Sequence, residues 1–549
     1  MVKKYFYLIV VILFSLISCY ALFHSGLPPT HDGEYHVVRF YEFDKVLRSG
    51  VFYPRWASDL NKGYGVPLFN YVYPFSNYFA SFLHAFGMSF IDSFKINMII
   101  ATIVGGVFFF LWSREYWKEV GGAISAIFYL YSPYRFVDVF VRGSVGEIWA
   151  LAFLPGFLWA IKKIENGKTE KWTVLASLLL AFIIFSHNIL ALMFSFFGLF
   201  YGLILLFQSK NRFRFFLHLG LTYILGLGLS SIFWIPALLE ITKVVGLKIY
   251  NIKESFVEVY QLIFPSWGTG FSTSDLGNQM SLQIGVGNLI VILASIGIGI
   301  WLIHKKHQYR SLFIFFLSSF FIVFFLMLSW SQMIWEAVPF MNFFQFPWRF
   351  LSLEIVICSF LAGCIPYFFR SKILIIILFV MPILLGIGYA HPAYYLERPD
   401  TYYTSRENFI SGTNSPGNVF NTIWFNTKLK YSTEKINIEK EKGEVSSQKI
   451  EPTRYFFNLN LKNDQIIIVQ TAYFPGWEAK GDNEKITVTR NKDGLISINV
   501  KKTIKNLKIF FASDPIMRTG ELISLLSLLF LFIVYFSADR RIKSIEYEN

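Results

Sequence analysis

Long apolar segments recur along almost the whole of this 549-residue chain. A helix needs about twenty consecutive apolar residues to cross the hydrocarbon core of a bilayer. Segments of roughly that length, or a little shorter, lie at 5–23, 96–112, 118–132, 147–161, 173–186, 189–207, 214–238, 285–303, 311–329, 350–369, 373–390 and 519–537. Since 54% of the residues are hydrophobic and only 16% are charged, no water-soluble fold could bury so much apolar surface. The sequence therefore predicts a polytopic α-helical membrane protein with about twelve transmembrane helices.

Basic residues mark every second gap between these segments. Lysine and arginine gather at both termini and in the short gaps 162–172, 208–214, 304–310 and 370–372. Cytoplasmic loops are enriched in these two residues, so we expect the four gaps and both termini in the cytoplasm. The long connections 24–95, 240–284 and 391–518 then lie outside the cell. The net charge of +14 follows from this topology and from contact with anionic lipids rather than nucleic acid, because the sequence has no compact basic domain.

The chain changes character after its eleventh apolar segment. Residues 1–390 read as one membrane domain, whereas 391–518 are polar, rich in lysine and alternating in hydrophobicity. The predicted strands run from Ile466 to Val469, Ile486 to Val488 and Leu495 to Val500. We expect an extracytoplasmic β-sandwich in 391–518, entered through the linker 402–418. Residues 519–549 then supply the last transmembrane helix and a cytoplasmic tail.

The first outer loop, residues 24–95, is too long and too patterned for a plain connector. Asp32 suits the N-cap of a helix that runs to about Ser49, and Gly50 suits the position just past its end. A second helix is predicted to begin at Pro74, because proline is favoured in first turns, and to end near Gly87. Both helices carry apolar side chains on one side, so we expect these amphipathic helices to lie along the membrane surface.

Four ionisable residues, His31, Asp32, Glu34 and His36, open this loop at the mouth of the membrane domain. Asp32 can be both a helix cap and a reactive carboxylate, because a cap position holds its side chain at the helix mouth. Glu34 lies about 200° further round the helix, so we expect only one of the two acids to face a site, and we favour Asp32. Asp32, Glu34 and His36 also suggest a divalent cation, Mg²⁺ or Mn²⁺, although their spacing matches no strong ligand motif.

Several short motifs share this outward placement. They are His31-Asp32, Tyr53-Pro54-Arg55-Trp56, Gly63-Tyr64-Gly65, Tyr134-Arg135, Arg142-Gly143 with Glu147, Ser186-His187-Asn188, Phe346-Pro347-Trp348-Arg349 and Tyr473-Phe474-Pro475-Gly476-Trp477. In this order they resemble the GT-C class of integral-membrane glycosyltransferases. Within that class, the chain is most similar to the bacterial membrane proteins called YfhO-like or "6-pyruvoyl-tetrahydropterin synthase-related". The second name is historical, since the sequence shows no pterin chemistry.

The resemblance implies sugar transfer on the outer face of a bacterial plasma membrane, from a polyprenyl-phosphate donor such as an undecaprenyl-phosphate hexose. It also implies that an acid of the first outer loop is the catalytic residue, here Asp32, with Glu34 in place of the paired acid that many GT-C enzymes carry. The acceptor would be a glycan, a teichoic-acid-type polymer or a lipid of the envelope. The residues themselves favour a lipid-linked donor, because nucleotide sugars stay in the cytoplasm and no nucleotide-binding motif is present.

Arginine suits the phosphate of such a donor, because it offers bidentate and permanently charged hydrogen bonds. The outward-facing candidates are Arg349, Arg142, Arg55 and Arg135. Arg349 is the first choice because it stands on the apolar background of Phe343 to Phe350. Each candidate could instead snorkel to lipid headgroups or pair with a local acid such as Asp138 or Glu147.

Sugar rings stack on aromatic faces, and Tyr64, Trp56 and Trp267 are candidates for this role. His31 and His187 are candidates for polar contacts with the substrate. With 30 tyrosines and 14 tryptophans in the chain, most aromatic residues must nevertheless serve in the core or at the lipid interface. A lone histidine such as His187 is likewise more often a packing residue.

Two other functions fit parts of the sequence. A twelve-helix transporter or flippase of a lipid-linked sugar, or of another envelope precursor, would explain the helix number. Its two halves would be expected to repeat, and no repeat is evident. A non-catalytic envelope scaffold would need neither Asp32 nor the outer arginines. The sequence therefore favours a glycosyltransferase with Asp32 as its general base.

Overall fold

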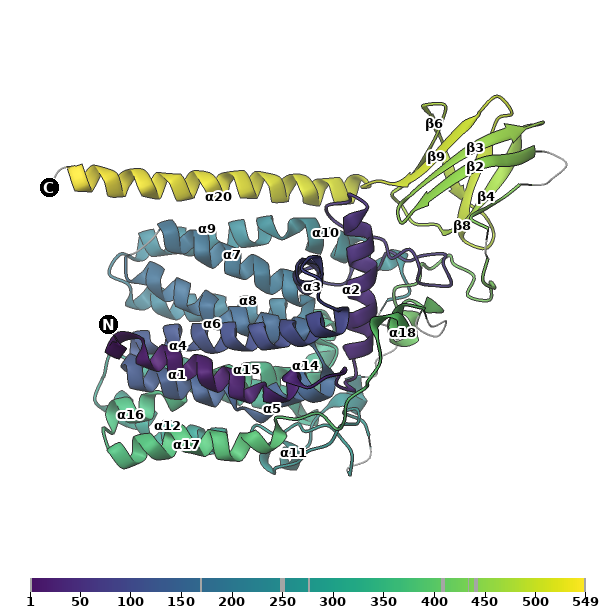
Figure 1. The fold of residues 1–549 in the computed structure, drawn as a ribbon. Helices are drawn as coiled ribbons and strands as arrows, with labels where there is room; N and C mark the ends of the chain where they lie inside the picture. Colours follow the sequence, from purple (N-terminus) through teal and green to yellow (C-terminus); the bar gives the residue numbers. More distant parts are fainter. Residues whose placement is uncertain are drawn as a thin grey trace.

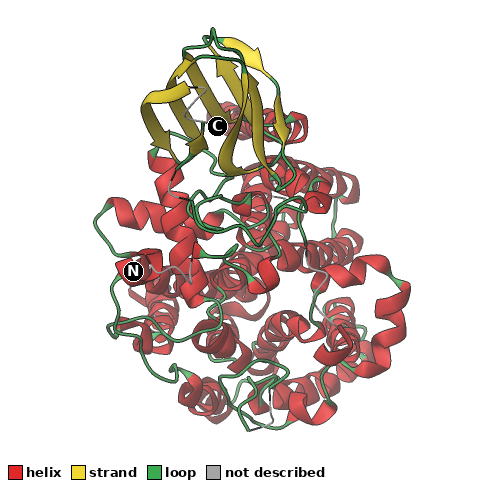
Figure 2. Cartoon of the chain, turned by 90° about the vertical axis from the view of Figure 1, so that its right-hand side faces the viewer, coloured by secondary structure: helices red, strands yellow, loops and turns green. Residues whose placement is uncertain are grey.

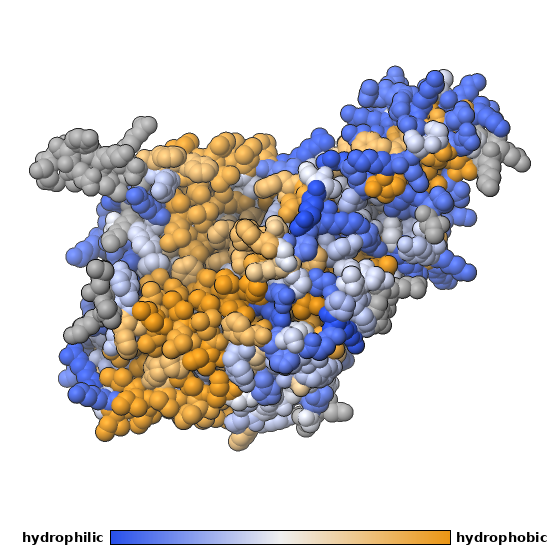
Figure 3. Space-filling model, viewed as in Figure 1, coloured by the Kyte–Doolittle hydropathy of each residue, from blue (hydrophilic) through white to orange (hydrophobic). Residues whose placement is uncertain are grey.

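A computed structural model of the chain shows a bundle of long helices with a β-sandwich at one end (Figure 1). It describes residues 2–167, 170–246, 252–274, 277–405, 410–432, 434–438 and 443–547. Both chain ends lie at the end of the bundle away from the sandwich (Figure 1). An apolar surface covers the visible side of the bundle, whereas the sandwich is mostly hydrophilic (Figure 3).

Every predicted apolar segment falls on one or more helices of the bundle. These helices are α1 (Val2–Ser18), α4 (Phe90–Leu130), α6 (Val145–Glu165), α7 (Glu170–Ser186), α8 (Asn188–Gln208), α9 (Arg212–Leu229), α10 (Ser231–Leu239), α12 (Val286–His304), α13 (Arg310–Met327), α15 (Leu351–Ala362), α16 (Cys364–Phe368), α17 (Lys372–Gly386) and α20 (Pro515–Tyr547). Within the described residues, eight helices are long and apolar enough to cross a membrane, or nine if α9 and α10, which meet at 69°, form one broken span. The fold is therefore that of a polytopic membrane protein.

This number is below twelve for two reasons. The backbone of α4 turns back at Lys118, where φ is 60°, so that its two arms lie side by side. A Cβ atom on Gly105 in the first arm would lie 2.9 Å from the hydroxyl of Tyr129 in the second. The single element α4 thus contains two of the predicted segments. In addition, α1 and α7 have only 17 residues each.

The first long loop folds at the sandwich end of the bundle (Figure 1). It forms α2 (Gly33–Arg48) and α3 (Phe75–Ala85), and α2 runs across the ends of the bundle helices (Figure 1). Asp32 is the N-cap of α2 and Ser49 its C-cap, so the bounds predicted for this helix are confirmed. Further short helices are α5 (Pro133–Phe136), the π-helix η3 (Val137–Arg142), α11 (Val259–Ile263), α14 (Gln332–Ala337) and α18 (Asp400–Ser405).

The predicted sandwich is formed by two antiparallel sheets that face each other above the bundle (Figure 2). The strands are β1 (Ile436–Asn437), β2 (Gly443–Glu451), β3 (Arg454–Leu461), β4 (Gln465–Ala472), β5 (Trp477–Gly481), β6 (Glu484–Ile486), β7 (Val488–Arg490), β8 (Leu495–Val500) and β9 (Asn506–Phe511). One sheet has the order β1-β4-β8-β7 and the other β2-β3-β9-β5-β6. Alternate residues such as Ile467, Val469, Ile496 and Ile498 are fully buried between them, as expected for strands with one solvated face.

Candidate active site

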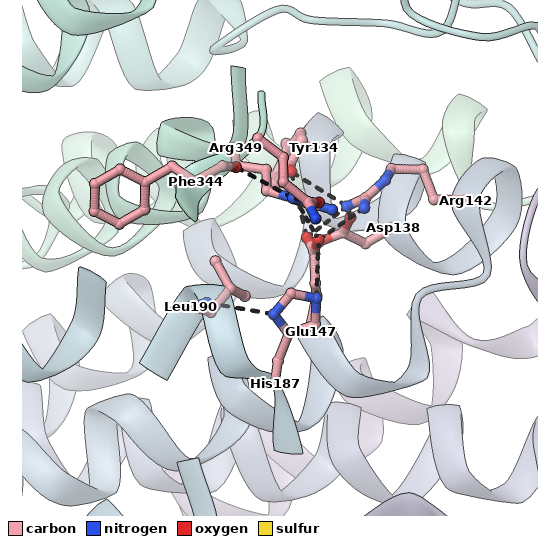
Figure 4. A network of polar contacts seen from close by, with 9 residues as sticks. Tyr134, Asp138, Arg142, Glu147, His187, Leu190, Phe344 and Arg349 are labelled. Carbon is pink, nitrogen blue, oxygen red and sulfur yellow. Dashed lines mark hydrogen bonds and ion pairs between the residues drawn. The ribbon is translucent and has the colours of Figure 1, made fainter. Parts of the chain in front are cut away.

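A buried carboxylate in the first turn of α6 binds two arginines (Figure 4). Glu147 accepts hydrogen bonds from Nη1 and Nη2 of Arg142, at 2.5 and 2.7 Å, and from Nε of Arg349, at 3.2 Å. Arg142 also donates to Oδ1 of Asp138, at 2.6 Å. This cluster joins η3 and the start of α6, which are neighbours in sequence, to the segment before α15, which follows 202 residues after Glu147. Glu147 is fully buried, so its charge is balanced by the arginines rather than by water.

Aromatic rings and further acceptors hold the two guanidinium groups in place. The guanidinium of Arg142 lies 4.8 Å from the centre of the Trp348 ring, and that of Arg349 lies 4.9 Å from the centre of the Phe346 ring. Arg349 Nη1 donates to the carbonyl oxygen of Phe344 at 3.2 Å and to Oε1 of Gln345 at 2.5 Å. Its Nη2 makes no hydrogen bond to any described residue and is not fully enclosed, so this donor remains available to a ligand.

The start of α2 docks directly on the arginine cluster. The backbone amides of His31 and Asp32 donate to the carbonyl oxygens of Val141 and Arg142, each over 2.9 Å. The neighbouring Gly143 has φ of 66°, and a Cβ atom there would overlap Oγ1 of Thr30. Two motifs that the sequence singled out, His31-Asp32 and Arg142-Gly143, are therefore held together by their backbones.

Asp32 caps α2 by position, but its side chain makes no capping hydrogen bond. Oγ1 of Thr30 accepts the hydrogen bond from the amide of Gly33 instead, at 3.1 Å. The expectation that capping would fix the Asp32 side chain is thus wrong, because the Thr30 hydroxyl takes that role. The half-buried carboxylate of Asp32 has no hydrogen bond or ion pair with any described residue, and it is close enough to Arg349 to interact with its charge.

Tyr73 also lies beside the arginine cluster, although none of the sequence motifs includes it. Its ring lies 5.2 Å from that of His187, centre to centre. Burial raises the pKa of its hydroxyl, the charge of Arg39 opposes this shift, and the charges of Asp32 and Glu147 add to it. In the sequence, only its position just before Pro74 distinguishes Tyr73. Tyr71 and other aromatic residues lie equally close to that proline, so this position does not identify Tyr73 as a site residue.

Two predicted histidines border the cluster. Nε2 of His31 lies 3.0 Å from the carbonyl oxygen of Thr269, which brings the second outer loop over the site. Burial lowers the pKa of His31. His187 caps α8 by accepting a hydrogen bond from the amide of Leu190, at 3.3 Å, while its Nε2 lies 3.6 Å from Glu147 (Figure 4). The structure therefore gathers Asp32, Arg142, Arg349, His31 and His187 at one end of the bundle.

Three predicted residues of the first loop lie at its contact with the sandwich and α20 instead. Trp56 is fully buried, and its ring lies 5.3 Å from that of Trp477. The Tyr64 hydroxyl donates to the carbonyl oxygen of Lys430 at 2.8 Å, and its own carbonyl accepts from the amide of Ala472. Both rings belong to the core of the sandwich, and Tyr64 also lines a small pocket beside Lys435 and Gln470. Arg55 pairs with Glu521 of α20 at 3.1 Å and donates to Asn70 at 3.0 Å, so it serves the packing of the last helix.

Two more predicted residues face other partners. Arg135 is buried between helices, where its Nη2 donates to Oγ1 of Thr102 at 2.7 Å. Its guanidinium lies 5.0 Å from the centre of the Tyr129 ring, so Arg135 is not part of the arginine cluster around Glu147. Nη1 of Arg398 lies 3.7 Å from Oε1 of Glu34, so Glu34 contacts the segment that leads to the sandwich.

Asp32, Glu34 and His36 do not form a metal site. Among the side chains that the structure describes, no group of three from histidine, cysteine, aspartate and glutamate could hold a metal ion. The physical reason is that Glu34 faces Arg398, while His36 is buried among the rings of Phe40, Tyr73 and Phe94. The residues present therefore do not fit a Mg²⁺ or Mn²⁺ site built from this motif.

A family model described as "6-pyruvoyl-tetrahydropterin synthase related domain; membrane protein" matches residues 69–393, which is more than half of the chain. The chain belongs to this family. The range matched to the 6-pyruvoyl-tetrahydropterin synthase related family contains Arg142, Glu147, His187 and Arg349, whereas Asp32 precedes it. No curated protein matches the sequence.

Two solved membrane proteins are similar to the chain in structure. The mycobacterial arabinofuranosyltransferase AftD is similar over 72% of this chain and 29% of its own, with 14% sequence identity and a TM-score of 0.46. The oligosaccharyltransferase AglB from Archaeoglobus fulgidus, solved with an inhibitory peptide and a dolichol-phosphate, is similar over 72% of this chain and 57% of its own. In that case the sequence identity is 12% and the TM-score 0.41. The chain thus spans less than two thirds of either protein.

Proposed function

We propose that the protein is a GT-C-type glycosyltransferase that moves a sugar from a polyprenyl-phosphate donor to a hydroxyl of an envelope acceptor. One observation carries this proposal: an unpartnered carboxylate, Asp32, lies beside a pair of preorganised arginines, Arg142 and Arg349. The order of motifs that resembles GT-C enzymes supports it as well. The positive-inside rule supports an Asp32 end that faces away from the cytoplasm, because the termini and the sandwich lie at opposite ends of the bundle (Figure 1).

Asp32 acts as the general base in this proposal. Its carboxylate takes the proton of the acceptor hydroxyl while the hydroxyl oxygen attacks the anomeric carbon of the donor sugar. The bond between that carbon and the phosphate oxygen breaks, and its electron pair leaves with the polyprenyl phosphate. Because Asp32 has no hydrogen bond or ion pair with the described residues, it gives up no internal contact when it binds the acceptor.

Arg349 and Arg142 stabilise the leaving phosphate. The uncommitted Nη2 of Arg349 is the donor best placed for a phosphate oxygen. Glu147 holds both guanidinium groups before the donor arrives, so no reorganisation is needed as charge develops. Burial, together with the charge of Glu147, raises the pKa of Asp138 well above its usual range, against the effect of Arg142. When Asp138 is protonated, Glu147 is the one carboxylate hydrogen-bonded to the two arginines, so the positive charge of the pair also acts on Asp32 and on a bound phosphate.

The partners follow from the same chemistry. The polyprenyl chain of the donor stays in the membrane beside the bundle, and the acceptor arrives from outside as a glycan, a teichoic-acid-type polymer or a lipid. We assign no step to a divalent cation, because the described residues form no ligand set for one.

The test is a transfer assay with the full-length protein in nanodiscs, an isotope-labelled polyprenyl-phosphate hexose and an envelope extract as the source of acceptor. Asp32→Asn should lower the transfer rate by about 10²- to 10⁴-fold and leave the melting temperature unchanged. Full transfer by this variant would remove Asp32 from the mechanism. Movement of the labelled lipid across vesicle membranes without any transfer would support the flippase alternative instead.

A further inference from the structure

On the outer face of the five-stranded sheet, a row of four lysines and one phenylalanine crosses all five strands. Strand pairing places Lys449 of β2 opposite Phe456 of β3, and Phe456 opposite Lys508 of β9. Lys508 in turn lies opposite Lys480 of β5, which lies opposite Lys485 of β6. Directly paired residues point to the same side of a sheet, so all five side chains share one face. With strands about 4.8 Å apart, the row is about 19 Å long.

The centre of this row is electrostatically unfavourable for the folded protein. Lys480 and Lys508 are directly opposite each other, and like charges in this position destabilise a sheet. Neither forms an ion pair with any residue that the structure describes, whereas the outer lysines do. Lys449 pairs with Glu451 at 2.7 Å, and Lys485 lies 3.6 Å from Glu478. The arrangement therefore leaves uncompensated positive charge in the middle of the face.

The two central strands of the four-stranded sheet, β4 and β8, carry no comparable charge on their outer face. The outward positions along β4 and β8 of the four-stranded sheet are all uncharged. They are Ile466, Ile468, Gln470, Ser497 and Asn499. A lysine-rich composition alone would place charge on both faces, so the row is a property of the five-stranded sheet.

The ammonium group of Lys508 lies over the two aromatic rings of this face. Nζ of Lys508 lies 5.5 Å from the centre of the Phe456 ring and 5.3 Å from that of Phe510. Both rings are half-buried, so the face has no protruding apolar side chain of the kind that inserts into a bilayer. The visible surface of the sandwich is mostly hydrophilic (Figure 3). A flat cationic strip without such an anchor fits an extended polyanion better than a membrane surface.

We propose that this lysine face, made by Lys449, Phe456, Lys480, Lys485 and Lys508, binds a linear polymer that carries phosphate groups in its backbone. Phosphates bridge the opposed ammonium groups of Lys480 and Lys508 and remove their repulsion. The length of the row lets one chain lie across the sheet and contact several lysines at once. This inference goes beyond the sugar transfer proposed above and does not depend on it, because it concerns binding on a separate domain.

The experiment measures binding of long-chain inorganic polyphosphate to the full-length protein in nanodiscs of neutral lipid. The wild type should bind, and added salt should weaken the binding. The double variant Lys480→Gln with Lys508→Gln should lose about tenfold in affinity. The matched control is Lys501→Gln with Lys502→Gln, which removes the same charge from the exposed loop between β8 and β9 and should stay within about twofold of wild type. The first pair should also melt no lower than wild type, because it relieves a repulsion.

Two results would overturn the inference. Equal losses in both double variants, or no binding by the wild type, would show that the row is not a polymer site. The second arm uses vesicles that contain phosphatidylglycerol. If Lys480→Gln with Lys508→Gln weakens vesicle binding but leaves polyphosphate binding intact, the face contacts the membrane and the polymer proposal is wrong.

Discussion

The backbone amide of Asp32 donates a hydrogen bond to the carbonyl oxygen of Arg142, over 2.9 Å. This contact makes the proposed base and a proposed phosphate ligand parts of one rigid unit. It is reinforced by the parallel hydrogen bond from His31 to Val141 and by the close approach of Thr30 to Gly143. The separation of the two residues along the site is therefore set by backbone packing.

Gly143→Ala should uncouple this unit without touching a functional side chain. The residue has φ of 66°, and the added methyl group would collide with Oγ1 of Thr30, so the start of α2 must move away from η3. We expect the transfer rate to fall by about tenfold or more, since misplacement by about 1 Å can cost that much. The measurement is the rate of sugar transfer together with the melting temperature.

The control for this prediction is Gly167→Ala. Gly167 also has a left-handed backbone, with φ of 86°, but a Cβ atom there meets nothing within 4 Å. This variant carries the same backbone strain, of about 1 kcal/mol, and should keep its activity. If both alanine variants behave alike, the packing of Thr30 on Gly143 has no role in the site.

Glu34→Gln should leave sugar transfer within about threefold of wild type, in contrast to Asp32→Asn. Glu34 is two residues from Asp32 in sequence, but its carboxylate faces Arg398 at 3.7 Å. Loss of this partly exposed contact costs little. Comparison of kcat/KM for the two variants distinguishes the acids, and a large loss in Glu34→Gln would indicate that both of them act.

The sequence predicts the local features of the site better than its long-range ones. The ends of α2 follow from a cap residue and a glycine, and those signals are local. The contact between Trp56 and Trp477 joins residues that are far apart in sequence. The sequence therefore predicts that Trp56 faces outward from the first loop, whereas it packs in the core of the sandwich. Tyr73 is missed for the same reason, since only the folded chain brings it next to His187. Arg349 can be picked out from the sequence because a charge on an apolar background stands out in a membrane protein, whereas Asp32 is indicated by its cap position after the first apolar segment.

Arg349→Lys should reduce transfer by about 10²-fold, although it keeps the charge. Lysine cannot reproduce the planar fork by which Arg349 binds Glu147 through Nε while Nη2 stays available. A raised KM for the polyprenyl-phosphate donor would show a loss of phosphate binding, and a lowered kcat would show a loss in the transition state. Arg55→Lys is the control, because Arg55 pairs with Glu521 of α20 and should affect stability rather than donor kinetics.

Glu147→Gln should destabilise the protein by about 3–5 kcal/mol, because it leaves two buried arginines short of a counter-charge. An amide oxygen also cannot replace the two carboxylate oxygens that Arg142 and Arg349 share. The melting temperature in detergent measures this effect. The matched control is Glu354→Gln in α15, a buried glutamate whose two oxygens have no hydrogen-bond partner in the described chain. That variant should be neutral or stabilising, and an equal loss in both would contradict the role assigned to the arginine pair.

The first outer loop should lose stability as the pH rises through neutrality. Burial raises the pKa of Glu42 in α2 to about 8; the charge of Asp59 adds to this shift and that of Lys45 opposes it. In the unfolded chain this carboxyl titrates near 4.3. Between about pH 4.3 and 8, the folded state therefore binds more protons than the unfolded state, so the free energy of unfolding falls with rising pH and is lowest once Glu42 has ionised.

Glu42→Gln should remove this dependence, because the amide stays neutral at every pH and can still accept the hydrogen bond from the amide of Asp59. Melting temperatures measured from pH 5 to 9 should fall by a few degrees more for wild type than for the variant. The exposed Glu484→Gln serves as the control and should follow the wild-type curve. Parallel curves for wild type and Glu42→Gln would mean that Glu42 is ionised in the folded protein and that another group sets the response to pH.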